Sequence, residues 1–207
     1  SGSTIPLGKA RNNALKYCQG ELVAFLDVED IWHPEKLEKQ LELFVDKTIG
    51  LIYSNYNNLY EDGRLVNGNN YYKFHRGNIF KKLLMKNFII LSSAICQRHI
   101  IDEFEGFPHY SFAEEYDLFL KISSKYMVDY IKEPLITYRY HKNSVTFNNF
   151  DNQIKEVLEI YDHWSETDDA ETTDIINYAI SFEYFALSRR FLFHLNDNLY
   201  LLIFLDH

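Results

Sequence analysis

The sequence predicts an α/β domain followed by a helical C-terminal region. Apolar, β-prone runs alternate with segments of helical periodicity as far as about residue 140, and this alternation favours a sheet flanked by helices. From residue 149 onward only apolar stripes with helical spacing remain. We therefore expect a sheet domain at residues 1–148 and a helical appendage at residues 149–207.

The first elements follow from local patterns. A helix is expected from Ala10 to Gly20, because glycine readily takes the left-handed conformation that ends a helix. Residues 21–26 form a short apolar run that predicts a buried strand ending in carboxylates. Pro34 suits a first helical position, so an amphipathic helix begins there.

The next segment predicts a strand and a hairpin, with a turn at residues 61–64. Further strands are expected at 94–97, 127–131 and 135–140, and helices at 77–86 and 114–126. Two apolar stripes then predict the tail helices. The first consists of Ile154, Val157, Leu158, Tyr161 and Trp164, and the second of Ile175, Ala179, Phe182 and Ala186.

Composition excludes several classes of protein. With 21 Lys plus Arg against 30 Asp plus Glu, the net charge of −9 argues against a nucleic-acid partner. Two cysteines cannot build a disulfide framework or a multi-cysteine zinc site. No apolar run reaches the roughly 18 residues of a membrane span. Without a signal-peptide pattern, we expect a cytoplasmic location.

Two acidic clusters are candidate sites. Asp27, Glu29 and Asp30 follow the predicted strand 21–26, where carboxylates suit Mg²⁺ or Mn²⁺ together with substrate phosphates. The alternative is that Asp30 caps the next helix and the other two are solvated.

Glu114 and Glu115, with Asp117 nearby, open a helix. They either complement the helix dipole or include a general base.

Three further side chains are candidates. His141 is either a ligand or proton-handling group, or a structural histidine. Trp32 and Tyr116 stand beside the acidic clusters, where an aromatic ring either stacks on a sugar or base or lies in the core.

Taken in order, five segments resemble the family 2 glycosyltransferases, which have a GT-A fold: a mixed sheet flanked by helices that binds a nucleotide sugar. The resemblance covers residues 10–146, and the family's opening strands have no counterpart before Ala10. We therefore expect a partial GT-A domain. The segments are ARNNAL, GELVAFLDVEDIWHPEKLEKQ, SSAICQRHIIDEFEGFPH, AEEYDLFLKI and EPLITYRYHKNSVT.

The resemblance assigns roles to named residues. Asp27 and Glu29 stand at the family's Asp-x-Asp motif, which holds Mn²⁺ or Mg²⁺ and the diphosphate. Glu115 stands at the position of the base. Both glutamates replace an aspartate, which extends each carboxylate by roughly 1.5 Å, and a misplacement of about 1 Å can cost on the order of a hundredfold in rate.

The other implied roles belong to residues around these two motifs. Glu114 precedes the base in the family's place, and Asp117 supports the same helix end. The remaining assignments are Arg11 and Asn12 to the nucleotide sugar, His141 to the metal, and Trp32, Tyr116 and Arg139 to the acceptor.

The implied activity is inverting transfer of a sugar from a nucleotide-diphosphate donor to an acceptor hydroxyl, in synthesis of a bacterial surface polysaccharide or glycoconjugate. The acceptor would be a glycan or a lipid-linked molecule. The resemblance leaves open a peripheral contact with the inner face of the cell membrane, and it does not indicate the oligomeric state. One alternative is a non-catalytic, truncated module that binds a partner protein or a membrane surface. The other, a nucleotidyltransferase, is disfavoured because no Walker-type glycine loop is present.

Overall fold

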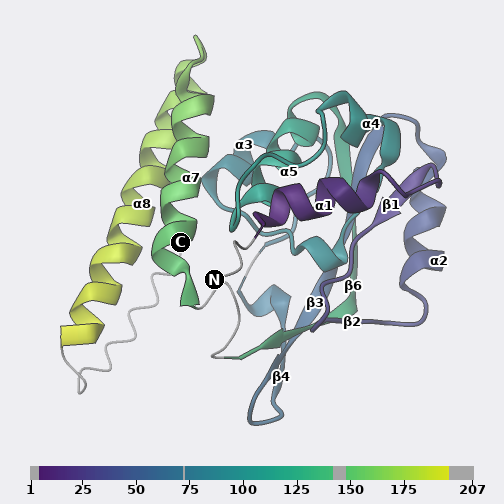
Figure 1. Cartoon of the computed structure of the whole chain (residues 1–207), viewed down its shortest axis with the longest axis horizontal. Helices are drawn as coiled ribbons and strands as arrows, with labels where there is room; N and C mark the ends of the chain where they lie inside the picture. The colour runs from purple at the N-terminus through teal and green to yellow at the C-terminus, as the bar shows by residue number, and fades with distance from the viewer. Residues whose placement is uncertain (1–4, 72, 142–147, 196–207) are drawn as a thin grey trace.

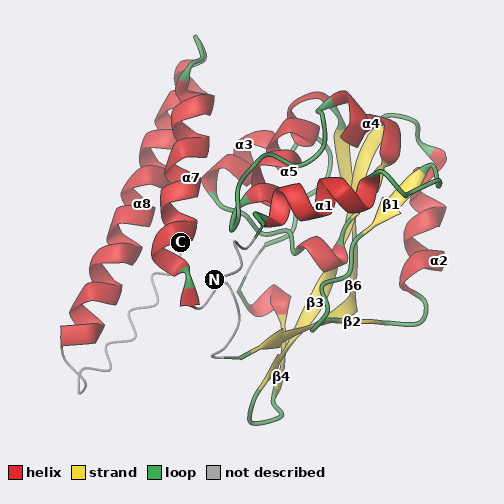
Figure 2. Ribbon diagram, in the orientation of Figure 1, coloured by secondary structure: helices red, strands yellow, loops and turns green. Residues whose placement is uncertain are grey.

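The structure is a computed structural model that describes residues 5–71, 73–141 and 148–195. A mixed six-stranded sheet has the order β1-β5-β3-β6-β2, with β4 paired to β3 outside this path. β3 and β6 run parallel, whereas the other pairs are antiparallel. Figure 2 shows the long twisted pair of β3 and β6 at the centre. The strands are β1 (Leu22–Ala24), β2 (Ile31–Trp32), β3 (Ile49–Tyr60), β4 (Leu65–Asn67), β5 (Ile95–Gln97) and β6 (Met127–Tyr140).

β3 and β6 are each one continuous strand where the sequence predicts two. The register between them shifts on both sides of Asn55, which lies opposite Pro134. Proline has no N–H for the ladder, and the bulge adapts the pairing to it. The Asn55 amide replaces the missing bonds, because it donates to the Lys132 carbonyl at 3.1 Å and accepts from the Tyr56 N–H at 2.7 Å. The predicted hairpin is confirmed, with Gly63 at φ 83° in its turn.

Most helices occur where the sequence predicts them, but their ends differ. The first helix spans Leu7–Leu15 instead of running from Ala10 to Gly20, because Leu15 is the last side chain that packs on the core and Tyr17 is 85% exposed. Neither α4 nor the two-residue β2 is predicted from the sequence. The helices are α1 (Leu7–Leu15), α2 (Lys36–Leu41), α3 (Phe80–Met85), α4 (Arg98–Glu103), α5 (Glu114–Lys125), α7 (Phe150–Ser165) and α8 (Ala170–Leu195), with short 3₁₀ turns η1 (Glu42–Val45), η2 (Gly68–Asn70) and η3 (Leu91–Ser93).

The core lies between the sheet and the helices α3, α4 and α5, and the tail helices extend it. α2 packs on β3 and β6 and lies across the sheet from α3 and the tail (Figure 1). Ile160 and Tyr161 of α7 and Ile176 and Ala179 of α8 belong to the main buried cluster. The tail therefore packs on the body, as predicted. Phe182 is an exception to its predicted stripe: it is 43% exposed, with the Lys86 ammonium over its ring.

Within the described ranges, no helix is both long and apolar enough to cross a bilayer.

Candidate active site

The acidic loop that follows β1 is fixed by Ser92 of η3. The Asp27 N–H donates to the Ser92 hydroxyl at 3.0 Å, and the Trp32 indole N–H donates to the Ser92 carbonyl at 2.9 Å. A turn closes between them, because the Asp30 N–H donates to the Asp27 carbonyl at 3.0 Å. The loop thus presents the Asp27 and Glu29 side chains, 41% and 35% exposed, to solvent.

Asp30 has a different role from its neighbours and does not cap the following helix. It is buried at 7% exposure and accepts a hydrogen bond from the Arg139 N–H of β6 at 3.3 Å. Burial raises the pKa of Asp30 to about 6. Hydrogen bonds from Ser92 and Arg139 oppose this rise, because they favour the charged form of the carboxylate. Asp30 therefore ties the acidic loop to β6.

Arg11 joins the two acidic clusters that the sequence places far apart. From α1, its Nη2 lies 3.0 Å from Oδ1 of Asp27, and its Nη1 contacts the carboxylate of Glu114 at the start of α5. Glu114 is 1% exposed, so the guanidinium compensates a charge that water cannot reach. The loop after β1 and the first turn of α5 are therefore parts of one site.

Glu115 lies next to this ion pair and is partly buried. Burial raises the pKa of Glu115; the positive charge of Arg11 opposes the rise, whereas the negative charges of Asp27 and Glu156 add to it. A carboxylate with a raised pKa is a stronger proton acceptor, which suits a general base.

Glu29 and His141 form a second pair of ligand-type side chains. Nε2 of His141 lies 2.7 Å from Oε2 of Glu29, and both are partly exposed. No group of three or more candidate metal ligands occurs among the residues that the structure describes. The Glu29 carboxylate in the loop after β1 and the His141 imidazole at the end of β6, with Asp27 two residues before Glu29, still suit an octahedral cation that takes its remaining ligands from phosphate and water.

Two other predicted site residues are held by structural contacts. The Asn12 amide donates to the Phe107 carbonyl at 2.7 Å and accepts from the Phe107 N–H at 2.8 Å. Asp117 is 4% exposed; it pairs with Lys121 at 2.8 Å and accepts from the indole of Trp164 at 3.4 Å. Asp117 thus connects α5 to the tail.

The three residues predicted to contact the acceptor differ in their exposure to solvent. The acceptor role predicted for Tyr116 is corrected by its position. Tyr116 is 3% exposed and its hydroxyl donates to the Leu83 carbonyl in the core, so its ring cannot stack on an acceptor. Trp32 remains partly exposed beside the acidic loop, with the ammonium of Lys36 at 4.5 Å from its ring. The Arg139 side chain is exposed at the end of β6.

Sequence reasoning missed Ser92, Lys36 and Glu156. Ser92 has no local signal, since its role depends on folding. Glu156 did have one: it lies four residues before buried Ile160, and an acidic residue on the inward face of an amphipathic helix needs a partner.

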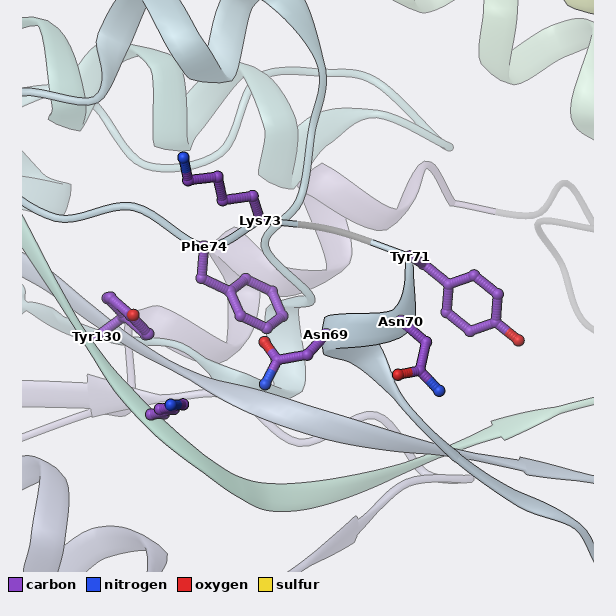
Figure 3. A pocket seen from close by; sticks show the side chains of 7 residues that line it. Asn69, Asn70, Tyr71, Lys73, Phe74 and Tyr130 are labelled. Atoms are coloured by element: carbon purple, nitrogen blue, oxygen red, sulfur yellow. The ribbon is translucent and has the colours of Figure 1, made fainter. Parts of the chain in front are cut away.

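An open hollow of about 480 Å³ lies apart from the predicted site residues, none of which line it. Figure 3 shows the Asn69 side chain below the Phe74 ring, with Tyr130 on the other side of that ring and Lys73 above. Its lining residues are Asn69, Asn70, Tyr71, Lys73, Phe74, Tyr130 and Lys132.

The mixed sheet with its flanking helices is the arrangement of the GT-A glycosyltransferases. S. aureus TarS in complex with UDP-GlcNAc superposes with a TM-score of 0.63 at 16% identity, over 93% of this chain and 56% of that one. The Pyrobaculum calidifontis mannosyltransferase PcManGT, in complex with GDP-Man and Mn²⁺, gives a TM-score of 0.56 at 16% identity, over 88% and 53%. The GT-A fold predicted from the sequence is confirmed.

Residues 2–160 match the model of glycosyltransferase-like family 2, and the chain belongs to this family. The Escherichia coli UDP-Glc:alpha-D-GlcNAc-diphosphoundecaprenol beta-1,3-glucosyltransferase WfgD is 30% identical over 176 residues, which are 83% of this chain and 66% of that protein. Pasteurella multocida chondroitin synthase is 27% identical over 151 residues, or 72% of this chain and 15% of that protein. The chain thus spans only part of the length of these relatives.

Proposed function

We propose that this protein transfers a sugar from a nucleotide-diphosphate donor to an acceptor hydroxyl, with inversion at the anomeric carbon. The observation that carries the proposal is the bridge made by Arg11, which holds the Asp27 loop and the Glu114–Glu115 turn together. Such transfer needs one group that accepts a proton and another that receives the departing diphosphate, and the two clusters are suited to these two tasks.

Glu115 is the proposed base. Its carboxylate takes the proton from the acceptor hydroxyl as that oxygen attacks the anomeric carbon opposite the diphosphate. Its raised pKa supports this role, because a more basic carboxylate holds the proton better. Glu114, neutralised by Arg11, keeps the first turn of α5 in place.

Asp27, Glu29 and His141 are the proposed ligands of a Mn²⁺ or Mg²⁺ ion. When bound, this ion would supply positive charge to the diphosphate. The contact of 2.7 Å between Glu29 and His141 supports a shared role for them, since each orients the other.

Trp32 and Arg139 are the proposed acceptor contacts, and the donor would bind near Arg11 and Asn12. The acceptor would be a glycan or a lipid-linked saccharide, as the names of WfgD and chondroitin synthase suggest for those relatives. A place at the inner face of a bacterial cell membrane, in surface polysaccharide synthesis, follows from this proposal.

The test is nucleotide release from a panel of UDP- and GDP-sugars by the full-length protein with Mn²⁺, using saccharide acceptors of defined structure. Proton NMR of the product reports the anomeric configuration. Nucleotide release that depends on acceptor and is lost in Glu115→Gln is expected, with an inverted product. Release of no nucleotide from any donor would favour a non-catalytic module instead.

A further inference from the structure

A carboxylate from the tail binds the segment that leads into the candidate base. Oε1 of Glu156, on α7, accepts the Ser111 N–H at 2.9 Å, and Oε2 accepts the N–H groups of Phe112 and Ala113 at 2.7 and 3.0 Å. Both oxygens are used, by three successive backbone donors. Gln153, one turn earlier on α7, donates to the Phe112 carbonyl at 3.2 Å.

These contacts anchor the segment that leads into α5, at a helix start that has no side-chain cap of its own. Ala113 occupies the N-cap position of α5 and has no side chain to bind the free N–H groups of the helix start. Glu156 instead comes from 43 residues further along the chain. A charged acceptor makes short, strong hydrogen bonds to backbone N–H groups, so Glu156 fixes this segment firmly.

The fixed segment directly precedes Glu114 and Glu115. α5 begins at Glu114, and the position of its first turn depends on the three residues before it. On the other side, the Gly8 N–H donates to the Tyr110 carbonyl at 3.1 Å, so α1 and α7 hold adjacent parts of one segment.

We propose that Glu156 is a positioning residue for Glu115, and that the helical region thereby forms part of the active site. This inference rests on the proposed function, in which Glu115 is the base. In this proposal α7 is more than an appendage: it donates no group to the reaction, but it sets the place of one that does.

Glu156 also acts on Glu115 through its charge. The charged groups around Glu115 are Arg11 from α1, Asp27 from the loop after β1, Glu156 from α7, and Glu114 on its own helix. The negative charge of Glu156 raises the pKa of Glu115. Removing this charge should therefore move the acidic limb of the rate profile to lower pH, and Glu156→Asp, which keeps the charge while shortening the reach, separates this effect from loss of packing.

Three substitutions separate geometry from charge. Glu156→Gln keeps the length of the side chain and removes its charge, Glu156→Asp keeps the charge and shortens the reach, and Glu156→Ala removes both. Glu159→Gln is the matched control, because Glu159 is exposed on the same helix and carries the same charge.

The first measurement is amide hydrogen exchange at residues 111–113. We expect exchange there to quicken about tenfold or more in Glu156→Ala, less in Glu156→Gln, and not at all in Glu159→Gln. Because amide exchange needs no substrate, it tests the anchoring whether or not the donor sugar has been identified. Melting temperatures confirm that each variant is folded, and Glu156→Gln stands in if Glu156→Ala is not.

The second measurement is steady-state transfer. We expect kcat to fall about tenfold in Glu156→Asp and Glu156→Ala with the donor KM unchanged, and the acidic limb to shift to lower pH only where the charge is lost. Exchange and kcat that match the wild type in all three variants would overturn the inference while leaving the proposed function intact. Faster exchange in a protein without any transfer activity would support the anchoring and count against the proposed function.

Discussion

The guanidinium of Arg11 and the carboxylate of Glu114 form an ion pair where α1 meets α5, and Glu114 is 1% exposed. Nothing in the order of the sequence predicts the pair, since the two residues are 103 positions apart. A buried carboxylate without a cation is costly, so α1 and α5 depend on each other.

Arg11→Met should lower the free energy of unfolding by about 3–5 kcal/mol, because it leaves the Glu114 charge buried and unpaired. Glu114→Gln in the same chain should restore part of the loss. Denaturant unfolding measures both. Arg98→Met is the control, since the Arg98–Asp102 pair is a more exposed i,i+4 pair, worth about 1 kcal/mol or less. An equal effect of the two arginine substitutions would contradict this account.

Glu115→Gln should leave donor binding nearly intact and lower turnover by about 10²- to 10⁴-fold, the usual contribution of a general base. Glu115→Asp, which restores the residue typical of the family, should retain activity if the segment before α5 tolerates the shorter reach. Turnover and donor affinity are measured separately, by initial rates and by calorimetry.

The same rate measurements, made on variants of the neighbouring carboxylates, identify which of them is the base. Asp117 binds Lys121 and Trp164, so Asp117→Asn should affect stability more than turnover. Full activity in Glu115→Gln, with loss of activity in Glu114→Gln, would show that the base is the neighbouring carboxylate.

The sequence predicts the order of elements because that order depends on local patterns. The run before Asp27, the hairpin around Gly63 and the helix at Glu114 each carry their own signal of periodicity or turn chemistry. The ends of elements are less well predicted, as at α1 and at the bulge opposite Pro134, because packing and pairing with distant residues decide them.

The site is predictable only as two separate clusters. Their residue types are visible in the sequence, but the Arg11 bridge and the hydrogen bonds of Glu156 to residues 111–113 are contacts between distant segments. Tyr116 illustrates the limit: an aromatic ring beside two carboxylates is compatible with stacking on a sugar, and only the helical phase of α5 places it in the core.

Glu29 and His141 should act together in metal binding. Glu29→Gln and His141→Ala should each weaken Mn²⁺ binding in the presence of UDP by about tenfold or more, because the loss of either side chain leaves the other without its partner at 2.7 Å. Electron paramagnetic resonance of free Mn²⁺ measures the affinity. His109→Ala is the control, since His109 is exposed elsewhere. Unchanged affinity in both variants would remove these residues from the metal site.

Lys36 should make the stability of the protein depend on pH. Its side chain is fully buried, its ammonium has no hydrogen-bond acceptor among the described residues, and the Trp32 ring lies 4.5 Å away. Burial lowers the pKa of Lys36 from 10.5 to about 7.

The sign of the effect follows from this lowered pKa. Between about pH 7 and pH 10.5 the unfolded chain binds more protons at this lysine than the folded one does. The free energy of unfolding should therefore rise with pH in this range, by up to about 1.4 kcal/mol per pH unit, and be insensitive to this group below pH 7. Urea unfolding from pH 6 to 7.5 tests the onset of this slope and stays about one unit below the pKa of roughly 8.5 of an unfolded thiol. Lys36→Met should abolish the slope, whereas Lys47→Met, at an exposed position, should keep it. Equal slopes in the wild type and Lys36→Met would mean that the lysine remains charged in the folded protein, with the Trp32 ring compensating its burial.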